Sequence, residues 1–117
     1  MSFFNTLFQK DPLKDSVIFI NDNIENIMPD HTDEKFNIIW YGDYHADPKN
    51  LVYWICVQTD KEKHALLADV GLNKKLRLLL DKYEYPEDAR SSVRIGFESQ
   101  EAVDRESNGS WDVHFKQ

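Results

Sequence analysis

The chain has few of the residues that mark specialised classes of protein. Of its 117 residues only Cys56 is a cysteine, and glycine and proline number four each. A single cysteine cannot form an internal disulfide, and so little glycine and proline argues against a collagen-like or low-complexity chain. Because Cys56 lies in an apolar stretch, we predict a buried, unreactive thiol in a reducing compartment.

Basic residues are also scarce. Lysine and arginine together number 14 against 21 aspartates and glutamates, which gives a formal net charge of −7 and a pI near 5.0. Phosphate backbones and anionic membranes attract basic surfaces, so we expect neither nucleic acid nor membrane as a partner. An acidic surface would instead attract a basic protein through long-range steering.

Long apolar runs and a basic leader are missing too. No stretch approaches the roughly 18 apolar residues that a membrane helix needs, and the first residues, MSFFNTLFQKDPLKD, do not have the pattern of a secretory signal. We therefore predict a cytoplasmic protein.

What is present predicts one α+β domain over residues 1–117. Hydrophobic residues make up 41% and charged residues 30% of the chain, as in ordinary globular proteins. The length suits a single core. We expect a mainly antiparallel sheet of about four strands, with an N-terminal helix and a central helical region packed on it.

The N-terminal helix has clear boundaries. Asp11 is a suitable N-cap, Pro12 suits the first helical position, and Pro29 prevents continuation. Between them apolar residues recur at steps of three and four: Leu13, Val17, Ile20, Ile24, Ile27 and Met28. Before Asp11 a short helical turn is predicted from Phe3, Phe4, Leu7 and Phe8.

The central helical region is expected in two parts. Thr59 or Asp60 caps a first helix through Leu66 and Leu67, and Gly71 breaks or bends it. A second apolar stripe then ends before a proline: Leu72, Leu76, Leu79, Leu80 and Tyr83.

A hairpin with two apolar faces lies between these helical regions, with strands at residues 36–44 and 51–59. In the first strand Ile38 and Trp40 share one face, whereas Ile39 and Tyr41 share the other. A strand in a two-layer domain needs only one apolar face. We expect the second face to lie under the helix at residues 72–83 or under another subunit.

The last third of the chain predicts two further strands around a short helix. Residues 93–98 alternate between apolar and polar, and Ser99 can cap a helical turn, QEAVDRE. Asn108 and Gly109 suit a turn before a final strand. Its inward-facing residues would be Trp111, Val113 and Phe115.

Common enzyme signatures do not occur in the sequence: we find no phosphate-binding glycine loop, nucleophile elbow or metalloprotease helix. Asp43, His45 and Asp47 occur at alternate positions and could bind Zn²⁺ or Mn²⁺. However, Asp47 precedes Pro48 at a turn, where an aspartate typically bonds the local backbone. We predict no catalytic, cofactor or metal residues, and a small metal-dependent enzyme is an alternative.

Aromatic and acidic residues near the hairpin loop and the short C-terminal helix predict a protein-binding surface. Tyrosines beside carboxylates suit an arginine- or lysine-rich partner through cation–π and ion-pair contacts. The predicted partner-binding residues are Tyr41, Asp43, Tyr44, Asp47, Glu98, Glu101 and Asp104.

As a small, acidic single domain with one cysteine in its core, the chain resembles the cytoplasmic immunity proteins that neutralise bacterial polymorphic or contact-dependent-inhibition toxins. The resemblance is one of size, charge and composition over the whole chain. It implies stoichiometric binding of a cognate toxin, often a nuclease with a basic substrate site. The alternative is a homo-oligomeric structural or accessory domain, a homodimer in which the doubly apolar hairpin packs against its own copy.

Overall fold

The computed structural model describes residues 11–115. Its first element is helix α2, Pro12–Ile27, whose start confirms the sequence prediction because the Asp11 side chain accepts a hydrogen bond from the Lys14 N–H. A short 3₁₀ turn, η1, Met28–Asp30, follows at the expected proline. The helical turn predicted before Asp11 lies outside the described residues.

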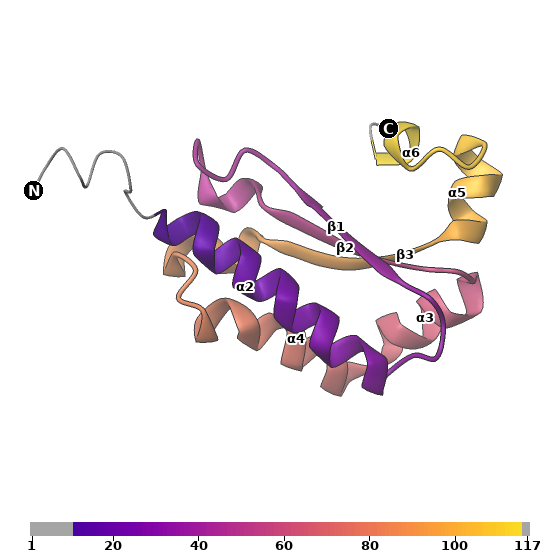
Figure 1. Cartoon of the computed structure of the whole chain (residues 1–117), viewed down its shortest axis with the longest axis horizontal. Coiled ribbons are helices and arrows are strands. Elements are labelled where there is room, and N and C mark those ends of the chain that lie inside the picture. Colours follow the sequence, from indigo (N-terminus) through magenta and orange to yellow (C-terminus); the bar gives the residue numbers. More distant parts are fainter. Residues whose placement is uncertain (1–10, 116–117) are drawn as a thin grey trace, which may run out of the picture.

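Within residues 11–115 the sheet has three strands, in the order β1, β2, β3 (Figure 1). They are β1, Asn37–Tyr41, β2, Val52–Val57, and β3, Arg94–Ser99. β1 pairs antiparallel with β2, and β2 pairs parallel with β3. The α+β class is confirmed, but the predicted sheet is corrected in two respects: it has three strands rather than about four, and it is mixed rather than mainly antiparallel.

The parallel pairing follows from the helical region between β2 and β3, which carries the chain back to the other end of the sheet. It consists of α3, Asp60–Ala68, α4, Val70–Lys82, and the 3₁₀ segment η3, Glu87–Ser92. The break between the two helices falls at Asp69 rather than at Gly71. Asp69 ends α3, and its side chain caps α4 by accepting the Leu72 N–H.

The predicted final strand is instead a helix. Ser99 caps α5, Gln100–Ser107, as expected, and the left-handed Asn108 ends it. α6, Trp111–Phe115, then begins where the Ser110 hydroxyl accepts the Val113 N–H. Trp111 and Phe115 are four residues apart, so they share one side of a helix as readily as of a strand. The third residue predicted to point inward, Val113, is 50% exposed.

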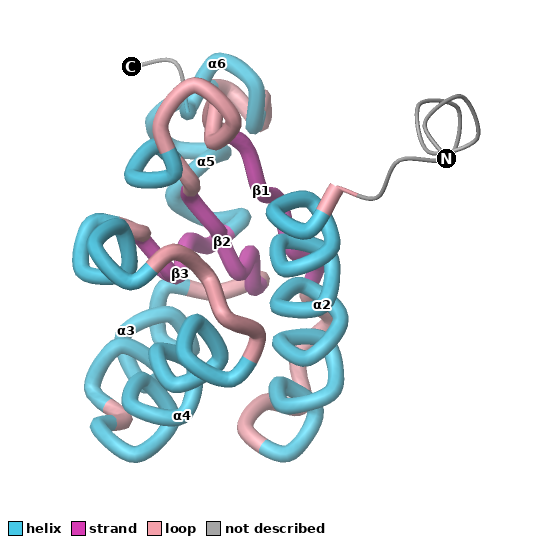
Figure 2. Tube along the Cα trace, turned by 90° about the vertical axis from the view of Figure 1, so that its left-hand side faces the viewer, coloured by secondary structure: helices cyan, strands magenta, loops and turns pink. Residues whose placement is uncertain are grey.

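One face of the sheet packs on α2 and α4, and α5 and α6 lie on the opposite side (Figures 1 and 2). Tyr53, Ile55 and Val57 of β2 are fully buried in the core on the side of α2 and α4. The Tyr53 hydroxyl donates a 2.7 Å hydrogen bond to the Val17 carbonyl of α2. No helix within residues 11–115 has both the length and the apolar character needed to cross a bilayer.

Two glycines give a matched test of this fold. Gly42 follows β1 with φ of +109°, and a Cβ placed there would lie 2.1 Å from the Asn50 carbonyl oxygen. We expect Gly42→Ala to lower the unfolding free energy by about 2–4 kcal/mol through strain and steric overlap. Gly71→Ala in α4 meets no atom closer than 3.6 Å. It should raise stability by up to about 1 kcal/mol.

Urea unfolding followed by circular dichroism measures both changes. A Gly42→Ala variant as stable as the wild type would contradict the tight turn after β1.

Candidate functional site

The second face of the sheet is covered in part by the chain itself. The Trp54 indole N–H donates a 3.0 Å hydrogen bond to the Tyr41 hydroxyl, and the Phe115 ring of α6 stacks on Trp54 with centroids 5.3 Å apart. Trp54 lies against Gly96 of β3, where a Cβ would come within 2.8 Å of the indole. The expected cover by residues 72–83 is corrected, because that helix is α4, on the opposite face. Cover by another subunit stays a prediction.

A cluster of polar side chains fixes α6 in this position. The Glu98 carboxylate of β3 lies 2.8 Å from His114 Nε2 of α6 and accepts a 2.7 Å hydrogen bond from Lys63 Nζ of α3. His114 Nδ1 lies 3.1 Å from the Ser107 hydroxyl of α5. These four residues, the Glu98 cluster, therefore join three helices and a strand.

The electrostatics of the cluster favour an ionised Glu98. Burial by itself would raise the pKa of Glu98, but hydrogen bonds from Lys63, His114 and the Ser99 N–H together hold that pKa below its ordinary value. A buried carboxylate with three donors, one of them the ammonium of Lys63, is adequately compensated. The cluster can thus hold a negative charge inside the protein.

The cluster contains a serine, a histidine and a glutamate, the residue types of a hydrolase triad. Ser107, however, is buried at the end of α5, with only 6% of its surface exposed. The Glu98 carboxylate also forms an ion pair with Lys63. We interpret the cluster as a structural clasp for α6.

A second hydrogen bond supports α6 from its first residue. Trp111 Nε1 donates to Gln100 Oε1 of α5 at 2.8 Å. Together with the Trp54–Phe115 stack, this contact leaves a cleft of about 500 Å³ between α6 and the edge strand β1. We call it the aromatic cleft; it is lined by Ile39, Tyr41, Trp111, Asp112 and Phe115.

The two aspartates that the sequence analysis selected in the hairpin loop bond to nearby backbone N–H groups. Asp43 accepts the Ala46 N–H, and Asp47 accepts the Lys49 N–H, which confirms the turn interpretation of Asp47. His45 instead pairs with Asp11, at 2.8 Å. Within residues 11–115 no three histidine, cysteine, aspartate or glutamate side chains converge in an arrangement that could hold a metal ion.

Two predicted partner-binding residues of this region differ in exposure. Tyr44 is only 8% exposed and packs against Trp40 and His45. Tyr41 is 39% exposed and faces the aromatic cleft. Of the tyrosines near the loop, Tyr41 therefore offers a partner the larger surface.

The remaining predicted residues lie at the other end of the sheet, because β3 runs parallel to β2 and α5 follows β3. Glu98 belongs to the clasp described above. Glu101 accepts the Asp60 N–H at 2.7 Å, and Asp104 accepts a hydrogen bond from the Gln100 side chain at 2.8 Å. The structure does not bring these acids together with Asp43 and Asp47.

The sequence analysis assigns three residues of the aromatic cleft to no binding site: Trp111, Asp112 and Phe115. The segment was interpreted as a strand, which would have turned both aromatic rings into the core. The spacing of four residues between Trp111 and Phe115 was the signal that could have indicated a helix.

Cys56 lies on the same face of the sheet as Trp54 and is fully buried. Burial, with a contribution from the charge of Glu98, raises the pKa of its thiol to about 12. The thiol therefore stays protonated at neutral pH, which confirms the buried cysteine predicted from the sequence.

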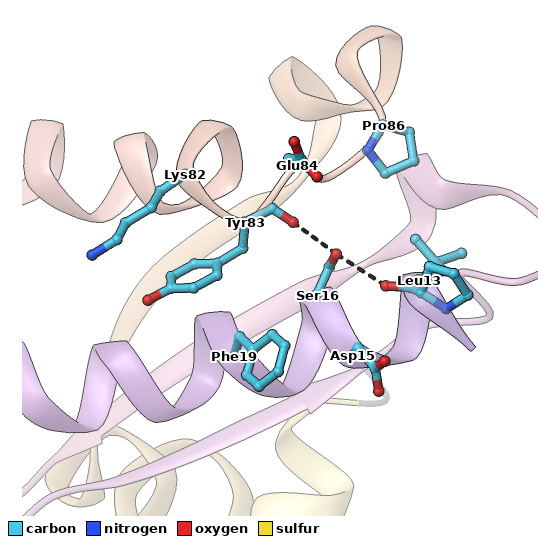
Figure 3. A pocket seen from close by; sticks show the side chains of 9 residues that line it. Leu13, Asp15, Ser16, Phe19, Lys82, Tyr83, Glu84 and Pro86 are labelled. Carbon is cyan, nitrogen blue, oxygen red and sulfur yellow. Dashed lines mark hydrogen bonds between the residues drawn. The ribbon is translucent and has the colours of Figure 1, made fainter. Parts of the chain in front are cut away.

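A second groove, of about 510 Å³, lies between the start of α2 and the end of α4 (Figure 3). Ser16 Oγ lies 2.7 Å from the Tyr83 carbonyl oxygen, and the Phe19 and Tyr83 rings are 5.8 Å apart (Figure 3). These contacts join the two helices. We interpret it as a helix junction and place the candidate site in the aromatic cleft.

No protein-family model, curated protein or solved structure matches this chain. The function is therefore argued from the geometry of the cleft and its surroundings.

The Glu98 cluster predicts how the unfolding free energy depends on pH. Because the pKa of Glu98 is lowered in the folded protein, its ionised form stabilises the fold above the ordinary value of 4.5, and this contribution is lost as the pH falls through the lowered pKa. Glu98→Gln should reduce the unfolding free energy at neutral pH by about 1–3 kcal/mol. The difference from the wild type should shrink below pH 4.5.

Urea unfolding between neutral pH and about pH 3 measures this difference. Glu25→Gln, at an exposed position of α2, is the matched control and should leave the unfolding free energy unchanged. If the difference in unfolding free energy between Glu98→Gln and the wild type is the same at every pH, Glu98 is not ionised in the folded protein.

Proposed function

We propose that this protein is a non-enzymatic protein-binding module, and most concretely an immunity protein that neutralises a cognate toxin by stoichiometric binding. The observation that carries the proposal is the aromatic cleft. Aromatic side chains that line an open surface cleft are typical anchors of protein interfaces, whereas scattered apolar residues are not. Here Tyr41, Trp111 and Phe115 are brought together by β1 and α6.

The charge of the chain supports a basic partner. With a net charge of −7 the protein would attract a basic toxin domain, such as a nuclease with its substrate site, and accelerate their association. Such a protein would act in the cytoplasm, the reducing compartment that its single thiol favours. Neither nucleic acid nor a membrane is part of the proposal.

The homodimer alternative concerns the same face of the sheet. There Phe115 stacks on Trp54 and Cys56 is fully buried, so part of the apolar surface is covered within one chain. The surface left for a second copy on that face is the aromatic cleft.

The proposal is tested against a defined partner: the C-terminal domain of a secreted protein encoded immediately upstream. We expect an equimolar complex and rescue of cells from the toxin. Tyr41→Ala should weaken the complex about tenfold or more, because removal of an interface anchor costs at least 1–2 kcal/mol. Isothermal titration calorimetry measures the affinity.

Leu78→Ala is the matched control. Leu78 is 51% exposed on α4, on the other side of the sheet from the aromatic cleft, and its removal should leave binding unchanged. Equal effects of the two substitutions would contradict the cleft as the interface. The immunity function would be contradicted by the lack of such an upstream gene or by failure of its product to bind, and light scattering from a stable dimer of the free protein would favour the homo-oligomer.

A further inference from the structure

We propose that Arg94 of β3 is a second anchor point for the protein partner and binds one of its carboxylates. The inference rests on the proposed binding function and adds the position and chemistry of a contact beside the aromatic cleft. The hydrogen bonding of the guanidinium, its contact with an aromatic ring, and its place on the same surface as the cleft support it.

The Arg94 guanidinium differs from those of the other described arginines in its hydrogen bonding. Arg77 and Arg90 donate to backbone carbonyls, and Arg105 donates to a carboxylate. The Arg94 side chain is exposed and, within residues 11–115, donates no hydrogen bond and forms no ion pair. Its N–H donors are therefore available to a group from outside the described chain.

The Trp54 ring determines where this charge lies. The guanidinium carbon of Arg94 is 5.6 Å from the centroid of the Trp54 ring, within the range of a cation–π contact. The indole is held in turn, because its N–H donates to the Tyr41 hydroxyl and the Phe115 ring stacks on it. A side chain that is already ordered loses less conformational entropy when it binds a partner.

Arg94 and the aromatic cleft belong to one surface. Tyr41 of β1 pairs with Val52 of β2, which pairs with Arg94 of β3, so the three side chains form a row across the second face of the sheet. The Trp54 indole links the two ends of this row, since its N–H reaches Tyr41 and its benzene ring lies against Gly96. Tyr41 and Arg94 are both exposed.

A carboxylate is the group that fits a single unpaired guanidinium. Its two oxygens can accept two parallel hydrogen bonds from the planar N–H fork, and its one negative charge balances the one positive charge. The net charge of −7 attracts a partner that is basic as a whole, and a basic protein also carries carboxylates. The contact with Arg94 would therefore fix the orientation of the partner rather than drive the encounter.

The two anchor points also define the spacing of the groups on the partner. Tyr41 and Arg94 are separated by two strand spacings, about 10 Å. An extended chain covers this distance in about three residues. A partner segment that crosses the strands would thus place an apolar side chain in the aromatic cleft and an acidic side chain, about three residues away, at Arg94.

The test uses three capped tetrapeptides and the free protein. Acetyl-Phe-Gly-Gly-Asp-amide carries both groups, a second peptide has Asn in place of Asp, and a third has Ala in place of Phe. Nuclear magnetic resonance follows the Arg94 Nε–H and the Trp54 indole N–H. We expect the Asp peptide to bind about two- to fivefold more tightly than the Asn peptide, as one exposed ion pair provides. The Ala peptide should bind more weakly than the Asp peptide, because it leaves the cleft empty.

Variants assign the preference for the Asp peptide to Arg94. Arg94→Gln should bind the Asp and Asn peptides equally, as followed by the Trp54 signal. Arg94→Lys keeps the charge without the planar fork and should retain only part of the preference. Lys74→Gln is the matched control, since it removes the same charge from an exposed position of α4, on the other side of the sheet, and should retain the full preference.

Two results would overturn the inference. If the wild type does not bind the Asp peptide more tightly than the Asn peptide, Arg94 takes no carboxylate, and if Arg94→Gln keeps the preference, the carboxylate binds elsewhere. Either result leaves the protein-binding function intact, because that function is decided by the complex with the toxin domain and by Tyr41→Ala. A preference that depends on Arg94, without any such complex, would instead overturn the function and keep the site.

Discussion

Strand β2 is apolar on both faces, and the rest of the structure depends on covering them. Tyr53, Ile55 and Val57 point to α2 and α4, whereas Trp54 and Cys56 point to the other side. Each large apolar side chain that leaves water contributes about 1.5–3 kcal/mol. A single layer of helices would forgo that gain on one whole face, so the chain adds a second layer with α5 and α6.

The second layer is small, and its size determines the candidate site. Within the part of the chain that the structure describes, α6 has five residues and places Phe115 over Trp54. The uncovered strip beside β1 becomes the aromatic cleft. Tyr41 stays 39% exposed there, so the partial cover and the candidate binding surface arise from the same arrangement.

The apolar stack of Phe115 on Trp54 attracts α6 to the sheet but depends little on the orientation of the helix. The hydrogen bonds of the Glu98 cluster depend strongly on geometry, so they fix that orientation. His114 is one residue before Phe115, and its bond to Glu98 fixes which side of α6 faces the sheet. Because Glu98 would be costly to bury without donors, its pairing with Lys63 and His114 also disfavours arrangements in which α6 is rotated or displaced.

The sequence predicts the elements of this fold better than their arrangement. α2 and the cap of α5 were predictable because Asp11, Pro12 and Ser99 act on their immediate neighbours. The direction of β3 was not, since it depends on how the helices between the strands pack. The segment from Trp111 to Phe115 satisfies both a strand and a helix pattern, and only its contacts with Trp54 and Glu98 decide between them.

For the candidate site, too, the sequence predicts single residues better than their arrangement in space. Tyr41 could be chosen from the sequence as an aromatic residue at the end of a strand. The residues that complete the cleft come from a helix far along the chain, and no local pattern connects them to Tyr41. The acids of the loop and of α5 looked like one surface in the sequence because the topology that separates them depends on the parallel pairing of β2 and β3.

That parallel pairing also orders the assembly of the chain. The β1–β2 hairpin closes over a short connection, residues 42–51, whereas β3 can join β2 only after residues 58–93 have formed the crossover. Loop closure costs more entropy as the connection lengthens, so β3 is expected to join late. Since α6 follows β3 in the chain and packs on Trp54 of β2, we expect the aromatic cleft to form late as well. Partner binding would then select fully folded molecules.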